Sequence, residues 1–232
     1  MAENIYLFVP NIIGYVRILL ALLSFWLMPH SPVGAITCYG ISTLLDSVDG
    51  HAARLLDQCT RLGAMMDMLT DRCSTFCLMF TLCIFYPSYA FIFQVSAALD
   101  IASHWLHLHS VTLQGAGSHK QIDQGGNSIL RYYYSNKAIL FLMCVGNELF
   151  YMSLYVLYFT EGWMVPVVGG DLSLRPILWA CLPVAVAKSG VNVVHLVSAA
   201  RTLVAIDHVE RARGGGGCEG KGEGWRLWSV CQ

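Results

Sequence analysis

The stretch 46–71 reads DSVDGHAARLLDQCTRLGAMMDMLTD and carries five aspartates in a chain that is otherwise mostly apolar. Four of these aspartates lie three or four residues from another one, which is the spacing of one helical turn. Because an α-helix has about 3.6 residues per turn, Asp46 and Asp49 share a face of one helix. Asp67 and Asp71 share a face of the next helix by the same rule. The stretch therefore predicts two acidic stripes on consecutive helices.

The composition around this stretch indicates a membrane protein. Of the 232 residues, 56% are hydrophobic and 12% are charged, whereas about 25% are charged in a typical soluble domain. The net charge of -1 gives no sign of a nucleic-acid partner. The nine cysteines show neither zinc-type spacing nor a secreted disulfide framework. We therefore interpret most of them as reduced residues that behave as small apolar side chains.

Six apolar segments have about the 20 residues that a membrane-spanning helix needs. Their approximate bounds are 8–28, 33–56, 62–86, 89–111, 138–159 and 176–200. Short, proline-marked links join the first segment to the second and the third to the fourth, which predicts helical hairpins. We therefore predict an all-α polytopic protein with six transmembrane helices and a short N-terminal juxtamembrane segment, surrounded by membrane lipids.

The basic residues predict the orientation of the bundle, because loops rich in lysine and arginine stay in the cytosol. Ten of them fall on the side of the second link, the fourth link and the C-terminus: Arg54, Arg61, Lys120, Arg131, Lys137, Arg201, Arg211, Arg213, Lys221 and Arg226. The opposite side has only Arg175. We therefore expect both termini and the acidic stripes to face the cytosol. We expect residues 1–213 to form one domain and the Gly-rich tail at 214–232 to be disordered.

Four carboxylates at the cytosolic ends of two antiparallel helices need compensation. A charge at the bilayer centre costs about 2.5–3.5 kcal/mol on insertion scales, and neighbouring carboxylates also repel one another. Two divalent cations would balance the four charges, and hard oxygen ligands favour Mg²⁺ or Mn²⁺. Such a pair can bind a diphosphate and stabilise both oxygens of a displacement. Asp57 lies outside both stripes, so we expect it in the solvated turn.

Small residues between the acids predict a substrate cavity. Gly50, Ala53 and Gly63 leave room for a flat or bulky group against the helix backbone. Arg54 and Thr60 stand at the mouth of this space, where they can contact a phosphate or a ribose. Taken singly, small residues more often mark helix packing. The prediction therefore depends on the joint pattern of acids and small residues.

The joint pattern D-x2-D-G-x2-A-R-x8-G-x3-D-x3-D resembles the signature of the CDP-alcohol phosphotransferase family, and every position is filled. The resemblance implies transfer of a phosphate-containing group from a CDP-linked donor to an alcohol, within a six-helix membrane fold that is usually dimeric. It also implies that Asp46, Asp49 and Asp67 hold metal, and that Asp71 completes the metal site and acts as general base. The residues it assigns to the CDP moiety are Gly50, Ala53, Arg54, Thr60 and Gly63.

A closer resemblance covers about residues 4–213 and indicates one branch of the family. It rests on the segments FVPNIIGYVRI, MLTDRCST, LDIASHWLHLHS, SHKQID, GNELFY and HLVSAAR. These are similar to segments of the eukaryotic members that make phosphatidylinositol from CDP-diacylglycerol and free myo-inositol. The spacing of the acids alone does not indicate this acceptor. The resemblance also implies a homodimer in the membrane of the endoplasmic reticulum.

Six further polar residues are candidate substrate contacts: Asn11, Arg17, Arg72, His104, Lys120 and Arg131. The sequence leaves their partners open. Arg72 can bind the acceptor or pair with a neighbouring acid, and His104 can line the acceptor site or anchor the membrane interface. Lys188 lies deep in the last span, where we expect a partner such as Glu148.

Other functions are open to a membrane protein with buried acids. Another member of the same family would use glycerol phosphate, serine or choline with an unchanged acidic site. A divalent-cation transporter would need acids along a path across the membrane, whereas these acids gather at one face. An intramembrane aspartyl protease would leave the second acid pair unexplained. A scaffold that has lost catalysis would not need the complete signature.

Overall fold

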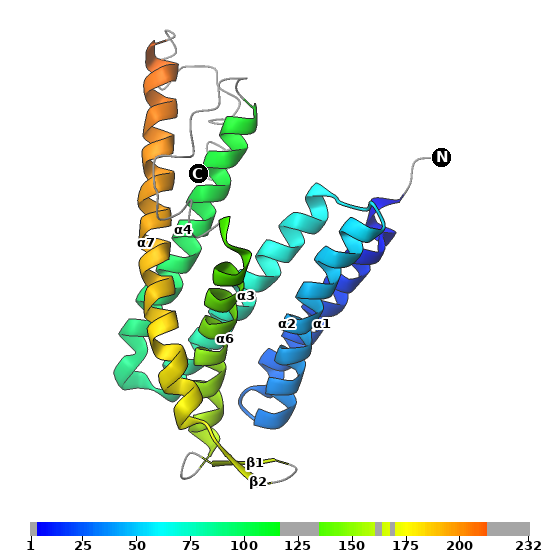
Figure 1. The fold of residues 1–232 in the computed structure, drawn as a ribbon, viewed down its shortest axis with the longest axis vertical. Helices are drawn as coiled ribbons and strands as arrows, with labels where there is room; N and C mark the ends of the chain where they lie inside the picture. Colours follow the sequence, from blue (N-terminus) through cyan, green and yellow to red (C-terminus); the bar gives the residue numbers. More distant parts are fainter. Residues whose placement is uncertain (1–3, 117–134, 161–163, 168–169, 213–232) are drawn as a thin grey trace. The chain divides into compact units, whose positions relative to one another are not determined.

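The computed structural model describes residues 4–116, 135–160, 164–167 and 170–212 (Figure 1). The chain forms two compact units, and helices α4 and α7 each contribute to both of them. The first unit contains residues 1–101 and 137–190, and the second contains residues 102–136 and 191–232. Lys120, Arg131 and the tail at 214–232 lie outside the described residues.

The described part is helical apart from one short hairpin. Its elements are η1 (Ile5–Leu7), α1 (Val9–Leu27), α2 (Pro32–Leu55), α3 (Arg61–Phe85), η2 (Pro87–Tyr89), α4 (Ala90–Ala116), α6 (Lys137–Phe159), β1 (Met164–Val167), β2 (Gly170–Ser173) and α7 (Arg175–Ala212). The helices confirm the predicted segments, and η1 forms the expected N-terminal segment. Strands β1 and β2 pair antiparallel with Val167 opposite Gly170, a short hairpin in the link before α7 that the prediction did not include.

The link between α2 and α3 is built by its own residues. Helix α2 ends in a Schellman motif, in which the Gln58 N–H donates to the Ala53 carbonyl at 2.9 Å. Asp57 has a φ of 52°, in the left-handed region that aspartate tolerates better than most residues. Thr60 then caps α3, because its hydroxyl accepts from the Gly63 N–H at 3.0 Å. The link confirms Asp57 as a turn residue and brings the two acidic stripes to the same end of the helix pair.

The core of the first unit lies at the end of the helices away from this link. Its buried members are Met28, Ala35, Tyr39, Leu78, Met79, Leu82, Phe93, Ala97, Tyr151 and Tyr155. Two tyrosines of this region close hydrogen bonds onto backbone carbonyls: Tyr155 donates to Met28 and Tyr86 donates to Leu154, both at 2.9 Å. These bonds connect α6 to the end of α1 and to the end of α3. The core therefore fixes the helices on which the acids stand.

Polarity is distributed as in a membrane protein, with polar groups inside and large apolar groups outside. Buried polar residues include Asn11, Arg17, Ser24, Asp49, Asp100 and Lys188. Exposed large apolar residues include Trp26, Leu44, Phe91, Phe141, Trp179 and Val186. Helices long and apolar enough to span a membrane cover Val9–Leu27, Arg61–Phe85, Ala138–Phe159 and Pro176–Val209. Four of the six predicted spans therefore match such helices, and the spans at α2 and α4 stay predictions.

Candidate active site

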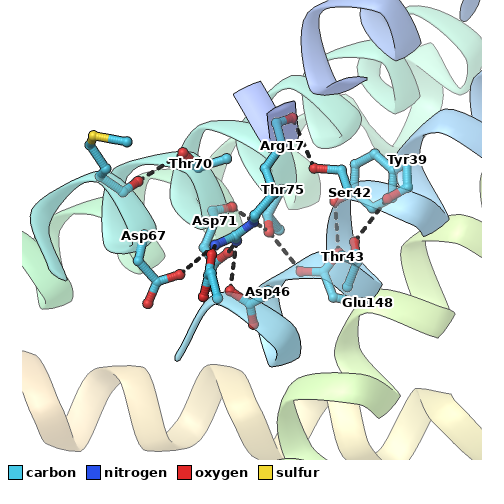
Figure 2. A network of polar contacts seen from close by, with 12 residues as sticks. Arg17, Tyr39, Ser42, Thr43, Asp46, Asp67, Thr70, Asp71, Thr75 and Glu148 are labelled. Atoms are coloured by element: carbon cyan, nitrogen blue, oxygen red, sulfur yellow. Dashed lines mark hydrogen bonds and ion pairs between the residues drawn. The ribbon is translucent and has the colours of Figure 1, made fainter. Parts of the chain in front are cut away.

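Four aspartates of α2 and α3 converge on one guanidinium from α1 (Figure 2). Arg17 Nη1 lies 2.5 Å from Asp49 Oδ2 and 2.7 Å from Asp67 Oδ1. Arg17 Nη2 lies 2.6 Å from both Asp46 Oδ1 and Asp71 Oδ1. The sequence predicted the two facing acid stripes, and the structure brings them together. The sequence did not predict that Arg17 contacts the acids, since it indicated Arg17 as a candidate substrate contact.

The acids are partly open, whereas Arg17 lies beneath them. The Arg17 side chain is 2% exposed, the Asp67 side chain 47%. Ser42 fixes the Arg17 backbone, because its hydroxyl donates to the Arg17 carbonyl at 3.1 Å. One oxygen each from Asp46, Asp49 and Asp67 lies within 4.8 Å of the others. This set of carboxylate oxygens fits the ligand chemistry of Mg²⁺ or Mn²⁺.

A cavity of about 200 Å³ opens beside the acids at the α2–α3 link. Its lining residues are Pro10, Asn11, Gly14, Asp49, Gly50, Ala53, Arg54, Gln58, Cys59, Thr60, Gly63, Ala64, Met66 and Asp67. All the residues that the sequence assigned to the CDP moiety are in this lining, together with two of the acids. The cavity therefore joins the predicted nucleotide residues to the predicted metal ligands.

The two signature glycines differ in what surrounds them. Among the described residues, a Cβ atom added at Gly50 would meet only the Arg54 side chain, with the nearest atom at 3.5 Å. A Cβ atom at Gly63 would lie 2.8 Å from Asn11 Oδ1 and 3.1 Å from Thr60 Oγ1. Gly50 therefore keeps cavity space open, as predicted. Gly63 lines the cavity too, but it also lets α3 approach α1.

Asn11 and Gln58 connect α1 to the rim of this cavity. Asn11 Nδ2 donates to the Ile5 carbonyl at 2.6 Å, while Asn11 Oδ1 is buried and has no hydrogen-bond partner among the described residues. The Gln58 side-chain oxygen accepts from the Val9 N–H at 3.0 Å. Sequence reasoning missed Gln58. Its position in the short link beside Thr60 was the available signal.

Glu148 is the other residue that sequence reasoning misplaced. It accepts from the Tyr39 hydroxyl at 2.8 Å and from the Thr75 hydroxyl at 2.6 Å (Figure 2). The Thr75 hydroxyl oxygen also lies 3.1 Å from the Asp71 carbonyl oxygen, which shares the same donor, so this network reaches the last acid of the stripe. Lys188, the expected partner of Glu148, instead contacts Cys144 Sγ at 3.3 Å. The predicted pairing of Lys188 with Glu148 is therefore wrong, since in the described part of the chain each of the two has other partners.

The remaining candidate contacts have other surroundings. Arg72 Nη1 lies 3.1 Å and 3.0 Å from the two carboxylate oxygens of Asp100, which is the pairing with a neighbouring acid. In the second unit, the His195 ring centroid lies 5.6 Å from that of His104 and 4.3 Å from that of His107. The sequence offered His104 as a candidate contact, and His195 of α7 brings its ring close to those of His104 and His107.

The chain belongs to the CDP-alcohol phosphatidyltransferase family, whose sequence profile matches residues 7–168. Its relatives include a human protein named CDP-diacylglycerol–inositol 3-phosphatidyltransferase, 53% identical over 91% of this chain and 98% of the relative. Proteins of the same name in Drosophila melanogaster and Schizosaccharomyces pombe are 47% and 46% identical. These cover 90% of this chain, and 90% and 93% of the relatives. A comparison with solved structures finds no match.

Proposed function

We propose that this chain transfers the phosphatidyl group of CDP-diacylglycerol to a hydroxyl of myo-inositol, as a phosphatidylinositol synthase. The observation that carries the proposal is the convergence of Asp46, Asp49, Asp67 and Asp71 beside a cavity lined by the nucleotide-assigned residues. The name shared by relatives across animals and fungi supports inositol as the acceptor. The residue pattern supports the class of reaction independently of that name.

Asp46, Asp49 and Asp67 are the residues that would hold divalent cations, with Asp71 completing the set. Their oxygens are hard donors gathered within a few ångströms, which suits two Mg²⁺ or Mn²⁺ ions. When bound, such ions neutralise the diphosphate and stabilise the charge on the departing oxygen. Gly50, Ala53, Arg54, Thr60 and Gly63 would hold the CDP moiety in the adjoining cavity.

Asp71 acts as the general base in the proposed reaction. Its carboxylate takes the proton of an inositol hydroxyl as that hydroxyl becomes acidic in the transition state. The hydroxyl oxygen forms a bond to the phosphorus that carries diacylglycerol, and the bond from this phosphorus to CMP breaks. Asp71 lies last on the α3 stripe, one helical turn beyond Asp67 and away from the cavity lining. In the proposed site, Asp49 and Asp67 therefore lie on the side of the nucleotide cavity, and Asp71 lies on the side where the acceptor binds.

We also propose six membrane spans, with the acids and both termini facing the cytosol. Helix α2 has 24 residues and α4 has 27, enough to cross a bilayer by length. The excess of lysine and arginine on the side of the α2–α3 link supports this orientation. Residues 1–213 form the one catalytic domain in this proposal. The family resemblance supports a homodimer in the endoplasmic reticulum.

An acceptor panel tests the proposed reaction. The purified protein in mixed micelles receives CDP-diacylglycerol and Mn²⁺, with myo-inositol, serine, glycerol 3-phosphate or choline in separate reactions. We expect CMP release and phosphatidylinositol formation with myo-inositol, and loss of both when EDTA replaces Mn²⁺. Release of CMP with serine or glycerol 3-phosphate, and none with myo-inositol, would reassign the acceptor. Uptake of Mn²⁺ by proteoliposomes without CMP release would favour transport.

A further inference from the structure

Arg17 occupies the point on which all four acids converge. Each acid directs one oxygen at its guanidinium, at 2.5 to 2.7 Å, and each terminal nitrogen serves two acids. The Mg²⁺–oxygen distance is about 2.0–2.1 Å, so a cation bound by the same oxygens would need the space that these nitrogens fill. The guanidinium and a divalent cation therefore exclude each other at this point.

The charges of these five side chains do not balance. Four carboxylates face one guanidinium, so the formal charge is three negative when every carboxyl is ionised. The Arg17 side chain is almost fully buried, and its Nε has no hydrogen-bond partner among the described residues. A buried arginine donor without a partner carries a desolvation cost. Arg17 therefore binds the acids without being fully satisfied by them.

We propose that Arg17 is an internal counter-ion, which holds the four carboxylates together until divalent cations bind and then leaves them. Without a cation between them, four partly buried carboxylates on two helices would repel each other and separate. Arg17 prevents this separation from a third helix, because α1 packs against α2 in the hairpin of Figure 1. The guanidinium therefore competes with divalent cations for the carboxylates and lowers their affinity, since each bound cation must displace it. The inference rests on the proposed metal site and not on the identity of the acceptor.

Arg17→Gln tests the proposal with Mn²⁺ as the probe. The variant is purified in Mn²⁺, and free Mn²⁺ is then measured by electron paramagnetic resonance during a titration of the metal-stripped protein. Because the variant lacks the guanidinium that fills the cation position, we expect Mn²⁺ to bind it at least about tenfold more tightly than the wild type, a change of about 1.4 kcal/mol. We also expect its unfolding temperature to fall in EDTA and to recover in saturating Mn²⁺.

Arg72→Gln is the matched control, because Arg72 is also an ion-paired arginine, and Asp100 is the one acid that it contacts in the described part of the chain. We expect it to lower the unfolding temperature equally with and without Mn²⁺ and to leave Mn²⁺ affinity unchanged. Arg17→Lys is the second variant: it keeps the charge but lacks the fork that reaches four acids, so its Mn²⁺ affinity should lie between wild type and Arg17→Gln.

Three results would overturn the proposal. Equal or weaker Mn²⁺ binding by both Arg17 variants would show that the guanidinium does not compete with the metal. An equal loss of stability with and without Mn²⁺ would show a purely structural role. An Arg17→Gln protein that fails to fold even in saturating Mn²⁺ would show the same. If the wild type transfers no inositol but the Arg17 variants bind Mn²⁺ as expected, the proposed function is wrong and the role of Arg17 stands.

Discussion

Asp46 and Asp57 belong to the same acidic stretch, but only Asp46 is directed at Arg17. We expect Asp46→Ala to weaken Mn²⁺-dependent CDP binding by at least about 100-fold. Mutation of residues that only support a metal ligand already lowers metal affinity by about 10- to 100-fold, and Asp46 is itself a proposed ligand. Calorimetric titration of CDP in the presence of Mn²⁺ measures this affinity. Asp57→Asn is the control, because asparagine tolerates the positive φ of this turn. Unchanged CDP affinity in Asp46→Ala would remove Asp46 from the metal set.

The two signature glycines give opposite predictions when each is replaced by alanine. Gly63→Ala places a methyl group 2.8 Å from Asn11 Oδ1, so we expect overpacking to cost about 1–3 kcal/mol of stability. Gly50→Ala meets no atom of the described part of the chain closer than 3.5 Å, so we expect normal stability and weaker CDP binding in a narrower cavity. Thermal unfolding and CDP titration of both variants separate these effects. Equal stability of the two variants would contradict the packing role of Gly63.

At the scale of residues, the sequence predicted the acids but not what they contact. Helical periodicity places Asp46 with Asp49 and Asp67 with Asp71, because both members of a pair stand on one backbone. Arg17 comes from a different helix, and its direction depends on how α1 packs, which local spacing does not encode. The Lys188–Glu148 prediction failed for the same reason, since depth in a membrane does not fix the side of a helix.

Helix α6 acts on the site through Glu148, which accepts two hydrogen bonds from α2 and α3. Glu148→Leu removes the carboxylate that accepts hydrogen bonds from both the Tyr39 hydroxyl and the Thr75 hydroxyl. Because an unsatisfied buried donor costs about 1–3 kcal/mol, we expect a stability loss of this size. We also expect reduced transfer activity, since Thr75 bonds the Asp71 carbonyl.

Glu148→Gln is the control for this network, because the amide keeps one acceptor oxygen for the two hydroxyls. We expect a smaller stability loss than in Glu148→Leu, measured by thermal unfolding in the same micelles. Equal losses in the two variants would indicate that side-chain volume, and not hydrogen bonding, determines the contribution of Glu148.

At the scale of elements, sequence patterns located the helices well and their ends less well. Helix α6 at Lys137–Phe159 agrees with the span predicted at 138–159. Helix α7 continues to Ala212, twelve residues beyond the predicted end at 200. The prediction ended where the apolar residues end, but a hydrogen-bonded helix can continue past the membrane with polar residues. The β1–β2 hairpin was missed because its strands have only four residues each.

The proposed orientation of the whole molecule can be tested with Cys59, which is exposed in the α2–α3 link. We expect a membrane-impermeant maleimide to label Cys59 in intact microsomes, in a variant whose other cysteines are alanine. Ser88→Cys in η2 is the control at the opposite ends of α3 and α4, and it should be labelled only after permeabilisation. The reverse labelling pattern would place the acids in the lumen.

In the proposed reaction this molecule is an inositol phosphatidyltransferase, and Asp71 is its general base. The most direct measurement is phosphatidylinositol formation from CDP-diacylglycerol and labelled myo-inositol, by wild type and Asp71→Asn side by side, with CDP-diacylglycerol binding measured on both. Because general-base catalysis contributes about 10²–10⁴-fold, we predict a fall of at least this size with binding retained. Undiminished turnover in Asp71→Asn would show that Asp71 is not the base, and no phosphatidylinositol from the wild type would show that the molecule is not an inositol phosphatidyltransferase.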